Sequence, residues 1–191
     1  MGYRYDIVTM INKENKKKME NKILVAYAST HGSTQEVAEK VAAALRERGM
    51  TVDLQPARNV RTLEGYTEVV LGAPIYMFHL HKDALNFLSR HQKTLSGGLP
   101  VAIFAGGPFD RPKAEDWQEI RRHLDAELAK YPWLAPVSIE VIGGKFDPAK
   151  LRFPWNLVPA LKNMPPSDLR DWPAIHAWAI SLFPNSQSLI A

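Results

Sequence analysis

The sequence predicts an α/β fold in which a five-stranded parallel sheet is covered by helices on both faces. Apolar runs typical of strands alternate with helical segments along nearly the whole chain, the pattern of strands joined by helical crossovers. The runs are continuously apolar, as expected of strands buried on both faces. For five such strands we expect the doubly wound order 2-1-3-4-5, in which ligands bind at the carboxyl ends of strands one, three and four.

The individual elements are predicted from apolar runs and from apolar spacings of three and four residues. The first strand covers residues 23–28, and the first helix runs from Gly32 to Arg48, with Gly49 ending it. Residues 57–66, where a second helix would lie, are short or irregular. The other strands are predicted over 51–55, 67–74, 100–105 and 137–142, and the other helices over 82–94, 113–131 and 171–183.

A turn of small and polar residues separates the first strand from the first helix. A helix N-terminus offers unpaired N–H groups and the positive end of its dipole, and hydroxyl groups add further donors. We therefore predict that this turn holds a phosphate group. The alternative is that Ser33 and Glu36 form a capping box, which needs no ligand. The residues of the turn are Ser29, Thr30, His31, Gly32, Ser33 and Thr34.

The third predicted strand ends in large flat or polarisable side chains. Such side chains are costly to leave in water and suit the wall of a site for a planar ring. The alternative is that Tyr76 and Phe78 pack beneath the following helix. The residues of this loop are Pro74, Ile75, Tyr76, Met77 and Phe78.

The fourth predicted strand ends in Ala105, Gly106, Gly107, Pro108 and Phe109. Paired glycines allow main-chain N–H and C=O groups to reach a ligand edge without an intervening side chain. The alternative is an ordinary tight turn. Because all three loops lie at the strand ends where such a sheet binds ligands, together they favour one shared site.

The order of residues in the first turn resembles the Thr/Ser-x-Thr/His-Gly-x-Thr loop with which flavodoxins hold the phosphate of flavin mononucleotide (FMN). Ser29, His31, Gly32 and Thr34 match that loop in register. The resemblance implies a flavodoxin-like three-layer sandwich with FMN as its cofactor. It also implies that residues 29–34 hold the phosphate.

The resemblance further implies positions for the flavin ring. Tyr76 and Met77 would lie against the ring, and Gly106 and Gly107 would contact its pyrimidine edge through their backbone. The ring would carry the redox chemistry, and no catalytic side chain is predicted.

Two further stretches, residues 72–76 and 165–178, resemble the flavodoxin-domain group that contains the menaquinone-dependent protoporphyrinogen dehydrogenases. In that group FMN passes reducing equivalents from a porphyrinogen towards a quinone. The chain departs from the group at the third loop, where Ser-Ile-Arg-Tyr is replaced by residues 74–77. The resemblance implies an FMN-dependent oxidoreductase with a quinone or a redox partner protein as acceptor. A small electron carrier and a flavodoxin-shaped module that binds no flavin stay open as alternatives.

Carboxylates are scarce in and near the three loops, where histidines and an arginine occur instead. Asp110 is their only carboxylate, whereas His31, His79, His81 and Arg111 lie in or near them. Carboxylates near a flavin disfavour its anionic reduced form, so we hypothesise a potential less negative than that of the acidic flavodoxin carriers. His79, His81 and Arg111 could contact a substrate or stabilise the anionic reduced flavin.

The composition, 46% hydrophobic and 23% charged, is that of a soluble globular protein. The absence of cysteine excludes disulfides, thiolate catalysis and Cys-ligated metal sites. The net charge of +4 is too dispersed to indicate nucleic acid binding. The histidine spacing matches no metal motif, so no metal is predicted.

Residues 1–20 are predicted to be a flexible extension, 21–185 the folded domain and 186–191 a tail. Because no secretory apolar region and no run of about 18 apolar residues occurs, we expect a cytoplasmic protein with at most peripheral membrane contact. A homodimer stays open. The connection 146–166 is unusually long, and a lid, a quinone-facing surface and a membrane contact are alternatives to an ordinary short helix.

Overall fold

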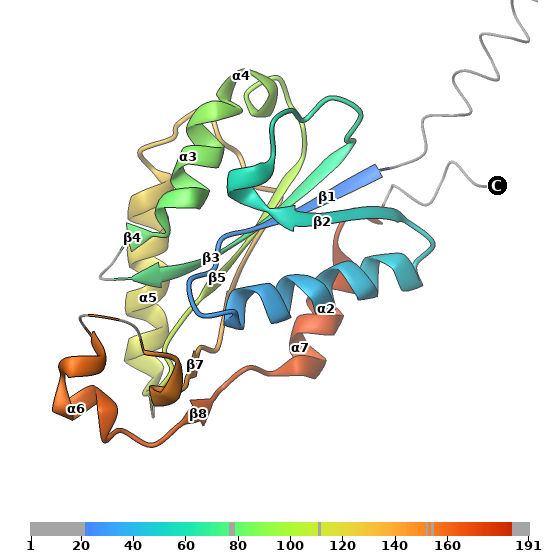
Figure 1. The fold of residues 1–191 in the computed structure, drawn as a ribbon. Coiled ribbons are helices and arrows are strands. Elements are labelled where there is room, and N and C mark those ends of the chain that lie inside the picture. The colour runs from blue at the N-terminus through green and yellow to red at the C-terminus, as the bar shows by residue number, and fades with distance from the viewer. Residues whose placement is uncertain (1–21, 77–78, 111, 152, 154, 185–191) are drawn as a thin grey trace, which may run out of the picture.

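The computed structural model describes residues 22–76, 79–110, 112–151, 153 and 155–184. Within these ranges one twisted sheet lies between two layers of helices (Figure 1). The predicted extension 1–20 and tail 186–191 lie outside the described residues.

Five parallel strands form the body of the sheet in the order β2-β1-β3-β5-β6. Each begins at its predicted first residue or at the residue next to it, and the order is the predicted 2-1-3-4-5. The α/β fold class is therefore confirmed. The strands are β1 (Lys22–Tyr27), β2 (Thr51–Pro56), β3 (Glu68–Tyr76), β5 (Val101–Gly106) and β6 (Ser138–Ile142).

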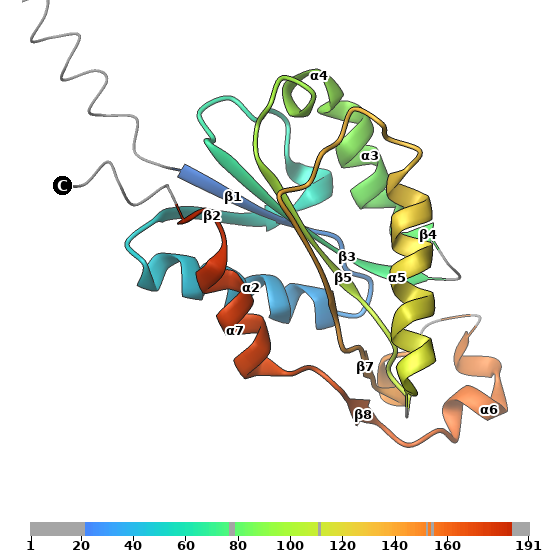
Figure 2. The ribbon, with the colours of Figure 1, turned by 180° about the vertical axis from the view of Figure 1, so that it is seen from behind.

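The main helices are α2 (Ser33–Glu47), α3 (Lys82–Arg90), α5 (Ala114–Leu128) and α7 (Trp172–Ser181). Helices α2 and α7 lie together on one face of the sheet, and α3 and α5 lie on the other (Figures 1 and 2). In β1, Ile23 and Val25 pack on the α2 side, whereas Leu24 and Ala26 pack on the α3 side. Because alternate side chains enter two different cores, every position of the strand must be apolar.

The predicted helices are longer than the observed ones. The segment 82–94 contains two helices, α3 and α4 (Gln92–Leu95). They are interrupted at His91, whose φ of −103° and ψ of 13° lie outside the helical range. Helices α5 and α7 are shorter at both ends than 113–131 and 171–183, because periodicity does not show where a terminal turn frays.

Three short strands are absent from the sequence prediction: β4 (His79–Leu80), β7 (Lys145–Phe146) and β8 (Ser167–Asp168). Strand β4 pairs antiparallel with the end of β3, so this sheet has six strands rather than the five predicted. Strands β7 and β8 pair with each other. A strand of two residues is too short to display a period of two.

The connection 146–166 forms short helical turns near the carboxyl edge of the sheet (Figure 1). They are η2 (Pro148–Lys150), η3 (Trp155–Leu157) and α6 (Pro159–Lys162), and residues 57–59 form a similar turn, η1 (Ala57–Asn59). Phe153 is 78% exposed and Leu157 is 68% exposed, so these side chains belong to neither core. None of the helices in the described ranges has the length and apolar character needed to cross a membrane.

Gly72 in β3 provides a test of how tightly the sheet is packed. A Cβ atom at this position would lie 2.0 Å from Cζ of Phe104, a fully buried ring in the neighbouring strand. We predict that Gly72→Ala lowers the free energy of unfolding by about 1–3 kcal/mol, because the ring must shift. Denaturant unfolding measures the loss. Gly106→Ala is the matched control, since its Cβ meets nothing closer than 3.5 Å; equal stability of the two variants would contradict the prediction.

Candidate functional site

The three loops predicted from the sequence meet at one crevice of about 160 Å³. Parallel strands end at the same edge of a sheet, and the chain reverses its direction of winding beside β1, so the topology brings these loops together. The predicted residues that line the crevice are Ser33, Thr34, Pro74, Ile75, Tyr76, Gly106, Gly107, Pro108 and Phe109.

The turn before α2 leaves the start of that helix accessible. Gly32 has a φ of 91°, in the left-handed region, and its N–H donates to Oγ of Ser29 over 2.9 Å. No side chain among the described residues caps the helix. The capping box considered for Ser33 and Glu36 is therefore not formed. The first N–H groups of α2 are therefore free to donate hydrogen bonds to an anion.

Thr30 connects this turn to the segment after β3. Its Oγ1 lies 3.1 Å from Nε2 of His81, while Nδ1 of His81 accepts the N–H of Asp83 over 3.1 Å. Because Nδ1 is an acceptor, Nε2 carries the hydrogen of the neutral ring and donates it to Thr30. Burial lowers the pKa of His81, which favours this neutral form.

Tyr76 lines the crevice at the end of β3 and is 44% exposed. The chain returns antiparallel at once in β4, with Tyr76 opposite His79, so the third loop is a hairpin. Partial burial raises the pKa of Tyr76, and a hydrogen bond with Thr30 opposes that rise. Met77 and Phe78, also predicted for the site, lie outside the described residues.

The loop after β5 is held by the strand beside it. The N–H of Gly107 donates to the carbonyl of Ile142 over 2.7 Å, and a Cβ on Gly107 would lie 3.0 Å from that oxygen. The sheet therefore already uses the amide that the sequence assigned to a ligand. Phe109 is 39% exposed, and its ring stacks on Phe146 with 5.3 Å between centroids and 19° between planes.

The remaining predicted residues lie around the crevice rather than in its lining. The side chain of Ala105 is fully buried in the core on the α3 and α5 side of the sheet. His31 lines a separate cavity of about 50 Å³ together with Ser33. Ser29, Thr30 and Gly32 form the turn itself.

His79 and Arg111, also considered from the sequence, lie away from the crevice lining or outside the described residues. Nδ1 of His79 lies 3.0 Å from Oε2 of Glu127, which Lys130 also contacts at 2.8 Å. Burial raises the pKa of Glu127, but the hydrogen bonds from Lys130 and His79 outweigh it and lower that pKa. Arg111 lies outside the described residues. No cluster of side chains suited to a metal ion occurs in the described part of the chain.

Comparison with known proteins agrees with this geometry. Residues 24–155, more than half of the chain, match the family of flavodoxin domains. This chain belongs to the flavodoxin domain family.

Within that family, the chain is 29% identical over 135 residues to protoporphyrinogen IX dehydrogenase [quinone] of Escherichia coli K12, covering 70% of this chain and 71% of that protein. Its fold is similar to that of rubredoxin oxygen:oxidoreductase of Desulfovibrio gigas, with a TM-score of 0.53 at 14% identity. That match covers 96% of this chain but only 40% of the other. A flavodoxin from the domain Archaea gives a TM-score of 0.51 at 13% identity, over 88% of this chain and 98% of that one. At these identities the two solved structures support the fold alone.

The flavodoxin domain of this chain has crevice residues that sequence reasoning missed. The pair Gly143-Gly144 directly after β6 was a visible signal, since it repeats the pattern of the glycine pair at the end of β5. Lys145 and Arg170 gave no signal, because an isolated cation in a sequence is ordinarily solvated. The missed lining residues are Val37, Ile120, Ile142, Gly143, Gly144, Lys145 and Arg170.

Arg170 ties the start of α2 to the segment before α7. Its side chain is 3% exposed and donates to Asp168 over 2.6 Å and to Glu36 over 2.8 Å. It also donates to the carbonyl of Ser33 over 3.3 Å, and Lys145 contacts the same Glu36 carboxylate at 3.2 Å. The buried guanidinium is thus surrounded by acceptors, as a buried charge requires.

These contacts lower the pKa of both carboxyl groups. Hydrogen bonds from Arg170 hold the pKa of Asp168 below its ordinary value. For Glu36, burial raises the pKa, but hydrogen bonds from Arg170 and Lys145 outweigh burial and leave the pKa lowered.

We predict that this network makes stability fall in acid. In the unfolded chain the carboxyl groups of Glu36 and Asp168 titrate at about pH 4. Their stabilisation is complete above that pH and is lost as the pH falls through the lower pKa values of the folded protein. Arg170→Met should lower the free energy of unfolding at neutral pH by about 1–3 kcal/mol and flatten its acid dependence. Urea unfolding from about pH 7 to about pH 3 measures both effects.

Arg121→Met is the control for this prediction. Arg121 and Asp125 form an exposed pair one helical turn apart at 2.9 Å, so its loss should cost less than about 1 kcal/mol. An Arg170→Met profile parallel to that of the unmodified protein would show that the network does not govern acid stability.

Proposed function

We propose that this protein is an FMN-dependent oxidoreductase that passes electrons between a protoporphyrinogen-like organic substrate and a quinone-type acceptor. The observation that carries the proposal is the crevice itself. It combines an uncapped helix start with exposed aromatic side chains from two other loops, at the edge where this fold binds ligands. The 29% identity to the curated dehydrogenase supports the choice of substrate and acceptor.

The described residues fit FMN in charge and in kind. FMN joins a dianionic phosphate to a flat aromatic ring, so its site needs donors at one end and apolar walls at the other. The start of α2 and the turn at Gly32 supply the donors. Tyr76 and Phe109, both substantially exposed on the crevice, supply aromatic surface that a ring would cover.

The roles of the residues follow from these positions. The turn 29–34 would bind the phosphate, and Tyr76 and Phe109 would orient the ring and exclude water from it. Thr30, whose hydroxyl is hydrogen-bonded to His81, would border the site between the phosphate and the flavin ring. When bound, FMN supplies the electron-accepting and electron-donating chemistry.

The charges around the crevice support a potential less negative than that of acidic flavodoxin carriers. Among the described lining residues, the ionised side chains are Lys145 and Arg170, both cations. Each is paired with a carboxylate outside the lining, so the net field is close to neutral. Carboxylates around a flavin oppose negative charge on its reduced form, whereas near-neutral surroundings do not.

FMN should raise the melting temperature of the protein. At a free concentration one hundred times the Kd, binding adds about 2.7 kcal/mol of stability, which for a chain of this size is about 5–10 °C. Thermal unfolding with and without FMN measures the shift. Adenosine monophosphate, which carries a phosphate but no flavin ring, is the control ligand and should give a smaller shift. No rise with saturating FMN would refute the proposal.

Catalysis distinguishes an enzyme from a carrier. The FMN-loaded protein should oxidise protoporphyrinogen over many turnovers when a menaquinone analogue is present, above the rate with the same amount of free FMN. The readout is the fluorescence of the porphyrin product. Oxidation that stops once each bound FMN has accepted two electrons would indicate a small electron carrier instead. A redox titration of the loaded protein tests the inferred potential, which a strongly negative value would contradict.

A further inference from the structure

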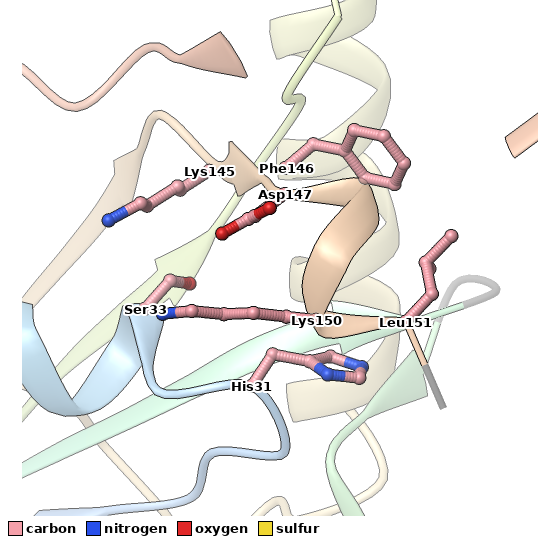
Figure 3. A pocket seen from close by; sticks show the side chains of 7 residues that line it. All are labelled: His31, Ser33, Lys145, Phe146, Asp147, Lys150 and Leu151. Carbon is pink, nitrogen blue, oxygen red and sulfur yellow. The ribbon is translucent and has the colours of Figure 1, made fainter. Parts of the chain in front are cut away.

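A small cavity beside the crevice is built by two segments that lie far apart in the sequence. One is the turn at the start of α2, and the other is β7 with η2, from the long connection before α7 (Figure 3). Its volume is about 50 Å³, well above the roughly 10–15 Å³ that one water molecule needs. The cavity can therefore hold a polar group larger than a single water. Its lining residues are His31, Ser33, Lys145, Phe146, Asp147, Lys150 and Leu151.

Lys150 is placed across this cavity. Figure 3 shows its extended side chain crossing from η2 towards Ser33, with His31 beside it. The turn that carries Lys150 is fixed, because Oδ1 of Asp147 accepts the N–H of Ala149 over 3.0 Å. The Asp147 carboxylate thus serves as the cap of η2.

The two lysines of the cavity have different partners. Lys145 contacts Glu36 at 3.2 Å, so its charge is balanced. The side chain of Lys150 is exposed and forms no hydrogen bond or ion pair with any other described residue, although its backbone N–H donates to the carbonyl of Asp147 over 3.0 Å. It is directed at the positive end of the α2 dipole, where a cation is repelled and an anion is favoured. This arrangement becomes favourable when an anion lies between the ammonium group and the helix.

We propose that Lys150 completes an oxyanion site over the start of α2 and thereby selects the phosphorylated form of the flavin. The inference rests on the proposed binding of FMN. The phosphate would be held by the first N–H groups of α2, the hydroxyl of Ser33 and the ammonium group of Lys150. Riboflavin has the same ring but no phosphate, so it gains nothing from Lys150. The long connection before α7 then contributes directly to the choice of cofactor.

The test compares FMN with riboflavin. Dissociation constants are measured by quenching of flavin fluorescence for the unmodified protein, Lys150→Gln and Lys162→Gln. Lys162 is the matched control, since it is an exposed lysine of α6 in the same connection and does not line the cavity. Lys150→Gln should weaken FMN about tenfold and leave riboflavin unchanged, because one charge-assisted hydrogen bond is lost. Lys162→Gln should change neither.

Two further measurements separate charge from structure. Lys150→Arg keeps the charge and should restore most of the preference for FMN. The FMN affinity of the unmodified protein should fall more steeply with salt than that of Lys150→Gln, because screening acts on the ion pair.

Each outcome decides the matter. Equal FMN affinity in all variants overturns the role of Lys150 and leaves the proposed function intact. Equal weakening of FMN and riboflavin in Lys150→Gln indicates a structural effect and overturns it as well. Failure of the unmodified protein to bind FMN at all overturns both the inference and the proposed function.

Discussion

Parallel pairing of β3 with both β1 and β5 brings all three loops of the crevice to one edge of the sheet. Tyr27 lies opposite Gly72, and Pro74 lies opposite Gly106, so the three strands end close together at one edge. Hydrogen bonds along these ladders hold that register, and both faces of the sheet are buried beneath helices. The turn 29–34, the segment after β3 and the glycine-containing loop after β5 must therefore emerge side by side. A shift in any of these pairings would separate them.

A second level of organisation comes from the chain after β6. The N–H of Gly144 donates to the carbonyl of Pro108 over 2.7 Å, and the N–H of Leu169 donates to Gly144 over 3.0 Å. These bonds fasten the loop after β5 to the segment that leads into α7. Arg170 then joins that segment to the start of α2. The crevice is thus closed on its far side by residues that follow the sheet in the sequence.

The two ends of the site differ in polarity in the same way as the two ends of a flavin nucleotide. One end has a helix start, a left-handed glycine and nearby cations, which suit a dianion. The other end exposes Tyr76 and Phe109, whose rings remain partly in water in the described structure. Exposed aromatic surface in a crevice is a common feature of sites for planar ligands. No acidic side chain occurs in the described crevice lining, and its two cations, Lys145 and Arg170, are paired with carboxylates outside it.

Local sequence patterns were sufficient to predict the five parallel strands, their order and the three loops at their carboxyl ends, but not the short strand β4. Burial on both faces leaves continuous apolar runs such as Ile23–Ala26, and helix starts leave polar turns such as residues 29–34; both are local signals. Only the tertiary structure decided that Ala105 faces a core, that Ile142 uses the amide of Gly107, and that Arg170 and Lys150 reach the start of α2. Those outcomes depend on which distant segments meet, and a local pattern of polarity carries no information about a partner that lies tens of residues or more away in the sequence.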